Sequence, residues 1–255
     1  AIEKAKKCGV SFVVVKNSEH FGAAGYYSLY AAEKGMIAIS MSNVDANMSV
    51  PGSKGKVIGN NPVSYAVPAG KYPPVFLDIA LSSVASLKVI KARHQGTKIP
   101  TTWIVDKDGL PTDDPSHYPE EGAMQPMAAH KGYGLAFMVE LLTGILAGAP
   151  FMTDIPSWLF VMPQPNNVSH TFICVDPAAF GDEQAFRNRV DEAIERLHNA
   201  PKAKGAEHIY YPGEIEWNNY ADAEKSGINI PADVAEELVK LSQWTGVPIK
   251  WREER

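Results

Sequence analysis

The sequence is poor in cysteine and has no excess of positive charge. Only Cys8 and Cys174 occur among its 255 residues, so a disulfide framework is excluded and a reducing, cytoplasmic location is expected. Lysine and arginine number 24 against 29 aspartates and glutamates, which gives a formal net charge of −5. This acidic balance argues against nucleic acid or an anionic membrane as a partner.

Long hydrophobic runs and several known fingerprints are also missing. The longest apolar stretch, residues 133–149, contains Glu140 and several glycines, which favours a buried helix over a membrane span. No G-x-G-x-x-G follows the first predicted strand, so the standard Rossmann fingerprint is absent. The absence of a G-x-S-x-G motif argues against a serine hydrolase. The histidines are scattered along the sequence, which argues against a metal site.

A start methionine is missing as well. Residues 1–7 have the pattern of the last two turns of an amphipathic helix, which Gly9 ends. The chain thus opens inside an element. We expect residues 1–255 to form one domain from which an upstream N-terminal segment is missing.

Short apolar runs alternate with helical patterns along the chain, which predicts an α/β fold. The first two strands and the helix between them are close enough to form a βαβ unit. Strands are predicted at residues 11–15 (buried), 36–42, 63–67, 75–80 and 171–175, and helices at residues 23–34, 82–93, 131–147, 181–199 and 231–244. Irregular loops are expected at 43–62 and 111–127, with a tight turn at 107–109.

His20 lies at the turn between the first strand and the first long helix. Four small residues, 22–25, follow it closely and would let a flat ligand approach the backbone. In open α/β sheets ligands bind at the carboxyl ends of strands, and histidine is suited to moving a proton near neutral pH. A structural histidine that caps the turn fits the local pattern equally well.

Two further places have a polar residue beside a predicted strand. Gly59-Asn60-Asn61-Pro62 could hydrogen-bond a ligand, although a simple turn is favoured on spacing alone. Asp78 ends an apolar run, where it could bind a ribose hydroxyl or orient His20. An N-cap for the helix that follows is an equal alternative for Asp78.

Lys131 stands in the predicted first turn of the long apolar helix. A cation is disfavoured there by the helix dipole, which attracts anions. Together with the helix amides and the nearby glycines 132 and 134, Lys131 predicts an anion site, such as a cofactor phosphate, in preference to a solvated surface lysine.

Six motifs occur in order over almost the whole chain. They are Asn17-x-x-His20-Phe21-Gly22 with Ala24-Gly25-Tyr26-Tyr27, Ile39-Ser40-Met41-Ser42-Asn43, Gly59-x-Asn61-Pro62, Leu77-Asp78-Ile79-Ala80, His130-Lys131-Gly132-Tyr133-Gly134-Leu135 and Tyr211-Pro212-Gly213-Glu214. Taken together, this set resembles the malate/L-lactate dehydrogenase family that lacks the Rossmann fold. That family also includes ureidoglycolate and sulfolactate dehydrogenases, diketogulonate reductase and cyclic-imine reductases.

The resemblance implies the family's own NAD(P)-binding α/β fold, with a mixed sheet flanked by helices. It also implies a homodimer or a larger assembly of dimers, with the site near the subunit interface. His20 would match the family histidine that exchanges a proton with the substrate oxygen. The cofactor groove would be lined by Ser42, Asn43, Val44, Asp45, Asp78, Ile79, Ala80, Lys131, Gly213 and Glu214. The family's upstream Ser-His pair and substrate-binding arginine have no counterpart in these residues.

The function expected from the resemblance is hydride transfer between a nicotinamide cofactor and a small 2-hydroxy or 2-oxo acid, such as malate, lactate or ureidoglycolate. His20 and Asp78 would be the catalytic pair, with Asp78 orienting the imidazole. NAD is favoured over NADP because no arginine cluster lies near the expected ribose site. The alternatives are a reductase of cyclic imines (piperideine- or pyrroline-2-carboxylate), a non-catalytic relic that kept the cofactor groove and, with less support, a metal-dependent hydrolase.

Overall fold

A computed structural model describes residues 1–157 and 164–251 of the chain. Two compact units are present, Ala1–Pro212 and Gly213–Arg255. The second unit carries α6 (Glu214–Ser226) and α7 (Ala232–Thr245). Within the described ranges, no helix combines the length and the apolar character that crossing a bilayer requires.

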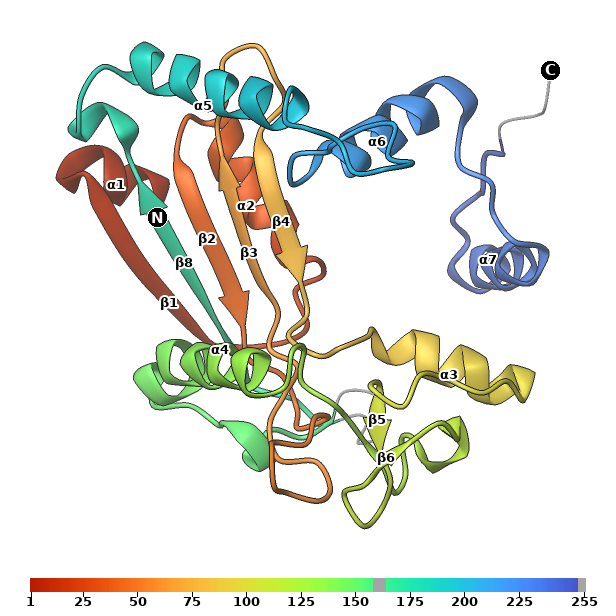
Figure 1. Cartoon of the computed structure of the whole chain (residues 1–255). Coiled ribbons are helices and arrows are strands. Elements are labelled where there is room, and N and C mark those ends of the chain that lie inside the picture. The colour runs from red at the N-terminus through yellow and green to blue at the C-terminus, as the bar shows by residue number, and fades with distance from the viewer. Residues whose placement is uncertain (158–163, 252–255) are drawn as a thin grey trace. The chain divides into compact units, whose positions relative to one another are not determined.

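Five strands form the main sheet of the first unit (Figure 1). They are β1 (Val10–Ser18), β8 (Val168–Val175), β2 (Ile37–Ser42), β3 (Val63–Val67) and β4 (Val75–Ile79), in this spatial order. Every neighbouring pair is antiparallel. Strands β1, β2 and β4 therefore run in one direction and end at the same edge of the sheet, while β3 and β8 run in the other.

Helices pack on both faces of this sheet. On one face lie α1 (Ile2–Cys8) and α2 (Ala24–Glu33), and Ser28 of α2 meets Ser64 of β3 through hydroxyl oxygens 2.6 Å apart. On the other face, α4 (His130–Glu140) continues into the π-helical turn η2 (Leu141–Ile145). The Thr171 hydroxyl of β8 donates to the Leu142 carbonyl of η2 at 2.6 Å. The face of β8 that carries Thr171 is thus the one that η2 covers.

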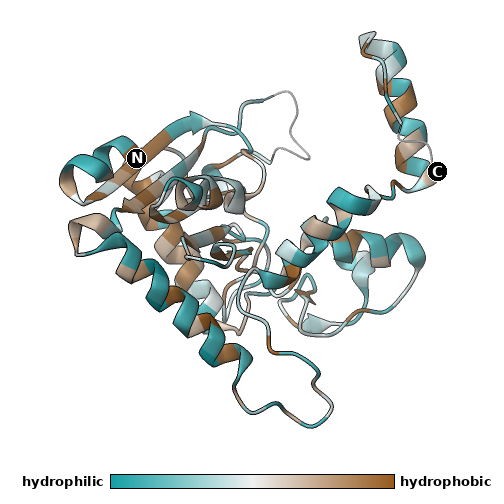
Figure 2. Cartoon of the chain, turned by 90° about the horizontal axis from the view of Figure 1, so that it is seen from above, coloured by the Kyte–Doolittle hydropathy of each residue, from teal (hydrophilic) through white to brown (hydrophobic). Residues whose placement is uncertain are grey.

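The remaining elements of the first unit lie around the ends of the sheet. Helix α5 (Glu183–His198) is fixed to the β3–β4 turn, since the Asp191 carboxylate accepts the backbone N–H groups of Gly70 and Lys71 at 3.0 and 2.9 Å. Figure 2 shows hydrophilic and hydrophobic residues side by side along the helices, as expected for helices that bury one side. Short 3₁₀ turns occur at Pro115–His117, Met152–Asp154 and Pro177–Ala179.

The main hydrophobic core lies on the α4 face of the sheet. It joins strand residues such as Met41 to Ala136 and Val139 of α4 and to Val89 of α3 (Ser86–Gln95). A smaller cluster on the other face packs α1 against α2, β2 and β8. Each face of the sheet thus has its own apolar cluster, and the larger one lies under α4.

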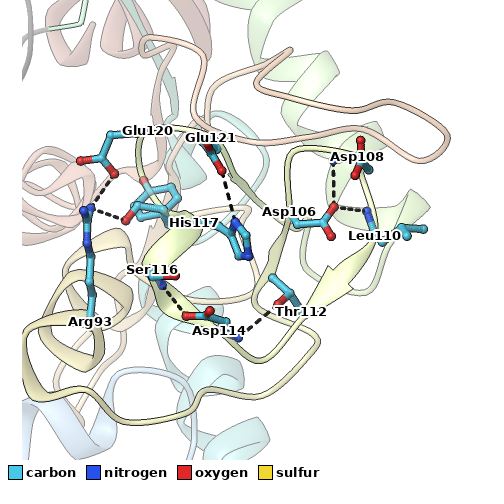
Figure 3. Close-up of polar contacts among 11 residues, drawn as sticks. Arg93, Asp106, Asp108, Leu110, Thr112, Asp114, Ser116, His117, Glu120 and Glu121 are labelled. Atoms are coloured by element: carbon cyan, nitrogen blue, oxygen red, sulfur yellow. Dashed lines mark hydrogen bonds and ion pairs between the residues drawn. The ribbon is translucent and has the colours of Figure 1, made fainter.

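A second, three-stranded sheet has the order β6-β5-β7, with β6 (Pro111–Thr112), β5 (Ile104–Val105) and β7 (Ala123–Met124). Its tight turn at 107–109 is confirmed: one Asp106 carboxylate oxygen accepts the N–H groups of Asp108 and Leu110 at 2.9 and 3.0 Å (Figure 3). The same hydrogen bonds hold the pKa of Asp106 below its usual range. Asp106 and its neighbours in Figure 3 thus serve the local fold.

The predicted α/β class with flanking helices is confirmed, but the main sheet is antiparallel throughout and not mixed, and individual elements need correction. The first strand is at the edge of the sheet and only Ser11 is buried, because a run of β-branched residues does not reveal how many neighbours a strand has. The first two strands run parallel, as a βαβ unit would, but β8 lies between them. The long apolar helix buries only one side, and α6 was not predicted.

Candidate active site at the carboxyl edge of the sheet

The turn that carries His20 is held on both sides by its neighbours. Before it, the Glu19 carboxylate accepts the backbone N–H of Asn166 at 3.0 Å. After it, the Phe21 ring stacks between Tyr27 and His170, with ring centroids 4.7 and 4.1 Å away. The Tyr27 hydroxyl also donates to the Phe21 carbonyl at 2.8 Å. The turn is therefore positioned by groups from α2, β8 and the segment before β8.

His20 itself is exposed at the edge where β1, β2 and β4 end. Its Nδ1 accepts the backbone N–H of Gly22 at 3.2 Å. Because Nδ1 accepts, the proton of the neutral ring is placed on Nε2, from which the ring can donate a hydrogen bond. Gly22 has a φ of +83° and no atom within 4 Å of the position that a Cβ would take, so a flat ligand can approach the backbone there.

A small cleft joins His20 to the segment that follows β2. Its enclosed volume is only about 30 Å³, far below that of a ligand pocket, so it marks a depression at the sheet edge and does not itself enclose a cofactor. The lining residues are His20, Phe21, Gly22, Ser42, Asn43, Val44, Asp45, Pro62, Asn166 and Val168. The cleft thus brings together the predicted catalytic histidine and one predicted cofactor segment, 42–45.

The four residues of that segment differ in burial: the first two are buried and the last two are half-buried. Ser42 and Asn43 are buried, and the Asn43 side chain accepts Ser169 N–H at 2.8 Å while donating to the Pro150 carbonyl at 3.2 Å. Val44 and Asp45 are half-buried. Partial desolvation raises the pKa of Asp45, and the positive charge of Lys56 opposes that shift. Val44 and Asp45 are therefore the members of the segment best placed to touch a ligand.

A buried carboxylate on α4 supports the segment from behind. Glu140 is fully buried, and its two oxygens accept the side-chain amides of Asn61 at 3.1 Å and Asn43 at 3.3 Å. Asn61 in turn accepts Val44 N–H at 3.1 Å and donates to the Ala136 carbonyl at 2.9 Å. Burial raises the pKa of Glu140, and the two amide hydrogen bonds oppose that shift. The Asn61 side chain therefore forms its hydrogen bonds with protein groups. Residues 59–62 are better interpreted as a structural turn than as a ligand-binding segment.

Asp78 has a role that neither sequence interpretation anticipated. Its carboxylate accepts the backbone N–H of Gly25 at 2.8 Å, so it caps α2, the helix that precedes it in the chain. The expectation that Asp78 caps the following helix was wrong, because the N–H group that it accepts belongs to Gly25, 53 residues earlier in the sequence. Partial desolvation raises the pKa of Asp78, while the Gly25 hydrogen bond lowers it. A Cβ at Gly25 would lie 2.9 Å from the carboxylate, which requires glycine there.

The other predicted cofactor residues lie outside the lining of the His20 cleft. Ile79 and Ala80 are half-buried at the end of β4, beside Asp78. Lys131 is exposed in the first turn of α4, after two alanines, 128 and 129, with positive φ values of 48° and 52°. Gly213 and Glu214 belong to the second unit, where Gly213, with a φ of +96°, is the N-cap of α6.

Sequence reasoning missed one residue at this edge, His170 on β8. It is buried, and its two ring nitrogens lie 2.9 Å from the hydroxyl oxygens of Ser42 and Ser18. The available signal was the pattern Ser169-His170-Thr171, three polar residues in a strand whose later part is apolar. Such a polar group inside a strand pattern marks a place where buried polar atoms need partners.

These features describe an α/β protein with an exposed histidine beside a small cleft at the end of a strand of the main sheet. Comparison with known proteins identifies its family. Residues 1–239 match the family described as malate/L-lactate dehydrogenase, and the chain belongs to that family. The resemblance carried by the six motifs is thereby confirmed.

Individual relatives agree with this assignment. The malate/(S)-sulfolactate dehydrogenase of Methanothermus fervidus is 34% identical over 254 residues, which is 98% of this chain and 72% of that protein. Crystal structures of malate dehydrogenase from Entamoeba histolytica and of Δ1-piperideine-2-carboxylate reductase from Pseudomonas syringae match with TM-scores of 0.90 and 0.82 and identities of 30% and 32%. Those matches cover 98% and 94% of this chain, and 73% and 70% of the other chains.

Proposed function

We propose that this protein is a nicotinamide-dependent oxidoreductase that interconverts a small 2-hydroxy acid and the corresponding 2-oxo acid. The observation that carries the proposal is the position of His20: it is exposed and lines one cleft with residues 42–45. Membership of a family of hydroxyacid dehydrogenases supports the same chemistry.

In this mechanism His20 is the proton donor and acceptor. During reduction, the imidazolium form of His20 gives its Nε2 proton to the oxygen of the 2-oxo acid and becomes neutral; during oxidation, the neutral ring accepts a proton at Nε2 from the hydroxyl group. When bound, the nicotinamide supplies the hydride chemistry at the substrate α-carbon. Both ring nitrogens carry a proton in the imidazolium, so formation of that state requires Nδ1 to release the Gly22 N–H.

The cofactor would contact residues at the ends of two strands, β2 and β4, and in the first turn of α4. We infer that Val44 and Asp45 touch it directly, whereas Ser42 and Asn43 hold them in place. Asp78, Ile79 and Ala80 would line the groove further along the same edge. Lys131, with the amides of the first turn of α4, would bind a cofactor phosphate.

NAD remains the favoured cofactor, with NADP as the alternative. Relatives of both kinds exist: ureidoglycolate dehydrogenase of Escherichia coli is named for NAD(+), and a (2R)-3-sulfolactate dehydrogenase of Chromohalobacter salexigens is named for NADP(+). A fluorescence titration of the protein with NADH and with NADPH decides between them by the tighter saturable binding. A folded protein that binds neither would contradict the proposal.

A cyclic-imine reductase is the second candidate, because the piperideine-2-carboxylate reductase structure matches the chain over almost its whole length. Oxidation of NADH or NADPH should be followed with a panel of 2-oxo acids and cyclic imines at equal concentration. Turnover restricted to the imines would replace the first proposal with the second.

A homodimer also remains a proposal. Helix α4 and its π-helical continuation present several large apolar side chains to the exterior, each 37–56% exposed, which is typical of a contact surface. They are Leu135, Met138, Leu141, Ile145 and Leu146. Light scattering on the wild type and on Leu141→Lys would test it: the wild type should be dimeric and the variant weakened, whereas a monomeric wild type contradicts it.

A further inference from the structure

His170 links the two sides of the candidate site. One ring nitrogen, Nε2, lies 2.9 Å from the hydroxyl oxygen of Ser18, two residues before His20. The other, Nδ1, lies 2.9 Å from the hydroxyl oxygen of Ser42, which begins the segment proposed to hold the cofactor. The flat face of the ring stacks on Phe21 with an angle of 2° between the planes. A single side chain therefore contacts residues on both sides of His20 and the start of the cofactor segment.

We propose that His170 is a positioning residue, which sets the His20 turn and the 42–45 segment at a fixed separation. The inference rests on the proposed function, because it gives these two segments their roles. His170 does not line the cleft. Its effect on catalysis would therefore act through Ser18 and Phe21 on one side and through Ser42 on the other.

The surroundings of His170 suit a fixed, uncharged support. The ring is 3% exposed, and each nitrogen faces a hydroxyl group, which can donate or accept a hydrogen bond. Burial lowers the pKa of His170 to about 4; the backbone of Glu19 raises it and the neighbouring His20 lowers it. The imidazole thus keeps one charge state at neutral pH while His20 exchanges protons.

Two substitutions test the contacts of the two ring nitrogens separately. The amide of His170→Asn can reach the position of Nδ1, so this variant keeps the Ser42 contact and loses Ser18. The amide of His170→Gln can reach the position of Nε2, so this variant keeps Ser18 and loses Ser42. Both lose the stacking on Phe21 equally. Cys174→Ala is the matched control, because Cys174 is buried on the same face of β8 but packs against α1 and α2.

Steady-state kinetics and cofactor titrations should respond differently in the two variants. We expect His170→Gln to raise the cofactor Kd by about 3- to 10-fold, the value of one hydrogen bond, with kcat within twofold of wild type. We expect His170→Asn to lower kcat by about 10-fold or more, because a misplaced catalytic group reacts slowly, while Kd stays within twofold. Cys174→Ala should change only the melting temperature.

Equal changes in kcat and Kd for the two variants, or changes no larger than those of Cys174→Ala, would overturn the proposal and leave His170 as an ordinary core residue. A wild-type protein that binds neither cofactor would instead refute the proposed function. In that case backbone NMR without ligand still decides the positioning role. His170→Asn should shift the amide signals of residues 18–22, and His170→Gln those of residues 42–45; the same shifts in both would refute it.

Discussion

The two faces of the main sheet differ in kind at the edge where the candidate site lies. On the α4 face, strand residues such as Met41 join a continuous apolar core with Ala136 and Val139. On the α2 face, a row of polar side chains crosses the strands, and each one bonds to a neighbouring element or strand: Ser42 to His170, Ser40 to Ala24, Ser64 to Ser28 and Asp78 to Gly25. The first face stabilises the protein, and the second fixes the position of α2 and of the His20 turn.

The largest effect is expected where the polar face meets the cleft. His20→Ala should lower kcat by about 10²- to 10⁴-fold, the usual contribution of a positioned proton donor. The cofactor Kd and the melting temperature should stay close to wild type, because the side chain is exposed. Kinetics and a cofactor titration on the same preparation check this. Unchanged turnover would remove His20 from the mechanism.

Substitutions of two adjacent residues of β2 compare how much each face contributes to the free energy of unfolding. Met41→Ala should lower the free energy of unfolding by about 2–5 kcal/mol, since it leaves a cavity in the apolar core. Ser40→Ala, which removes a hydrogen bond to the Ala24 carbonyl, should cost about 1 kcal/mol. Urea denaturation measures both values. Equal losses would mean that the polar face contributes to stability as much as the core does.

The raised pKa of Glu140 predicts how the stability of the folded protein depends on pH. Burial raises its pKa in the folded state above the ordinary 4.5, so the folded protein binds the proton more tightly than the unfolded chain. Its contribution is therefore greatest below pH 4.5 and declines as pH rises through the folded-state pKa, by at most about 1.4 kcal/mol per pH unit.

Glu140→Gln should remove this dependence, so that the variant gains stability relative to wild type as pH increases from 4 upward. Urea denaturation of both proteins from pH 4 upward measures the difference in their unfolding free energies. Because the two proteins share all other titrating groups, that difference reports on Glu140. A constant difference in unfolding free energy across the range would contradict the raised pKa.

An effect as modest as that of Ser40→Ala is expected at the cap of α2. Asp78→Ala should cost about 0.5–2 kcal/mol of unfolding free energy, because the Gly25 N–H loses its acceptor. Asp78→Asn keeps an acceptor oxygen and should cost less. If Asp78 also orients His20, Asp78→Asn will lower kcat without lowering stability; an unchanged kcat would restrict Asp78 to capping.

Local patterns in the sequence were sufficient for most strands and helices of the first unit. Runs such as residues 63–67 and 75–80 are short, apolar and bounded by proline, and they form β3 and β4 as predicted. Helix α6 was missed because Glu214–Ser226 mixes polar and apolar residues without a clear stripe. Chain order also gave no sign that β8 would lie between β1 and β2.

Of the candidate site, His20 and Asp78 were suggested by their places beside predicted strands, whereas residues 42–45 came only from the family resemblance. The structure brings these residues to one edge, because β1, β2 and β4 run in the same direction. The partners of these residues were not predictable: Gly25 is 53 residues from Asp78, and Ser42 is 128 residues from His170. Hydrogen bonds over such separations depend on the completed sheet and leave no local pattern in the sequence.

The insertion of β8 between β1 and β2 has a consequence for the order of folding. In the described sheet, β1 pairs only with β8, so residues 10–18 have no strand partner until residues 168–175 have left the ribosome. Pairings between distant segments form late because closing a long loop costs entropy. The His20 turn, which depends on β8 through His170, therefore takes its final form only after residues 168–175 have been made, when the core residues from Met41 to Val139 have already been synthesised.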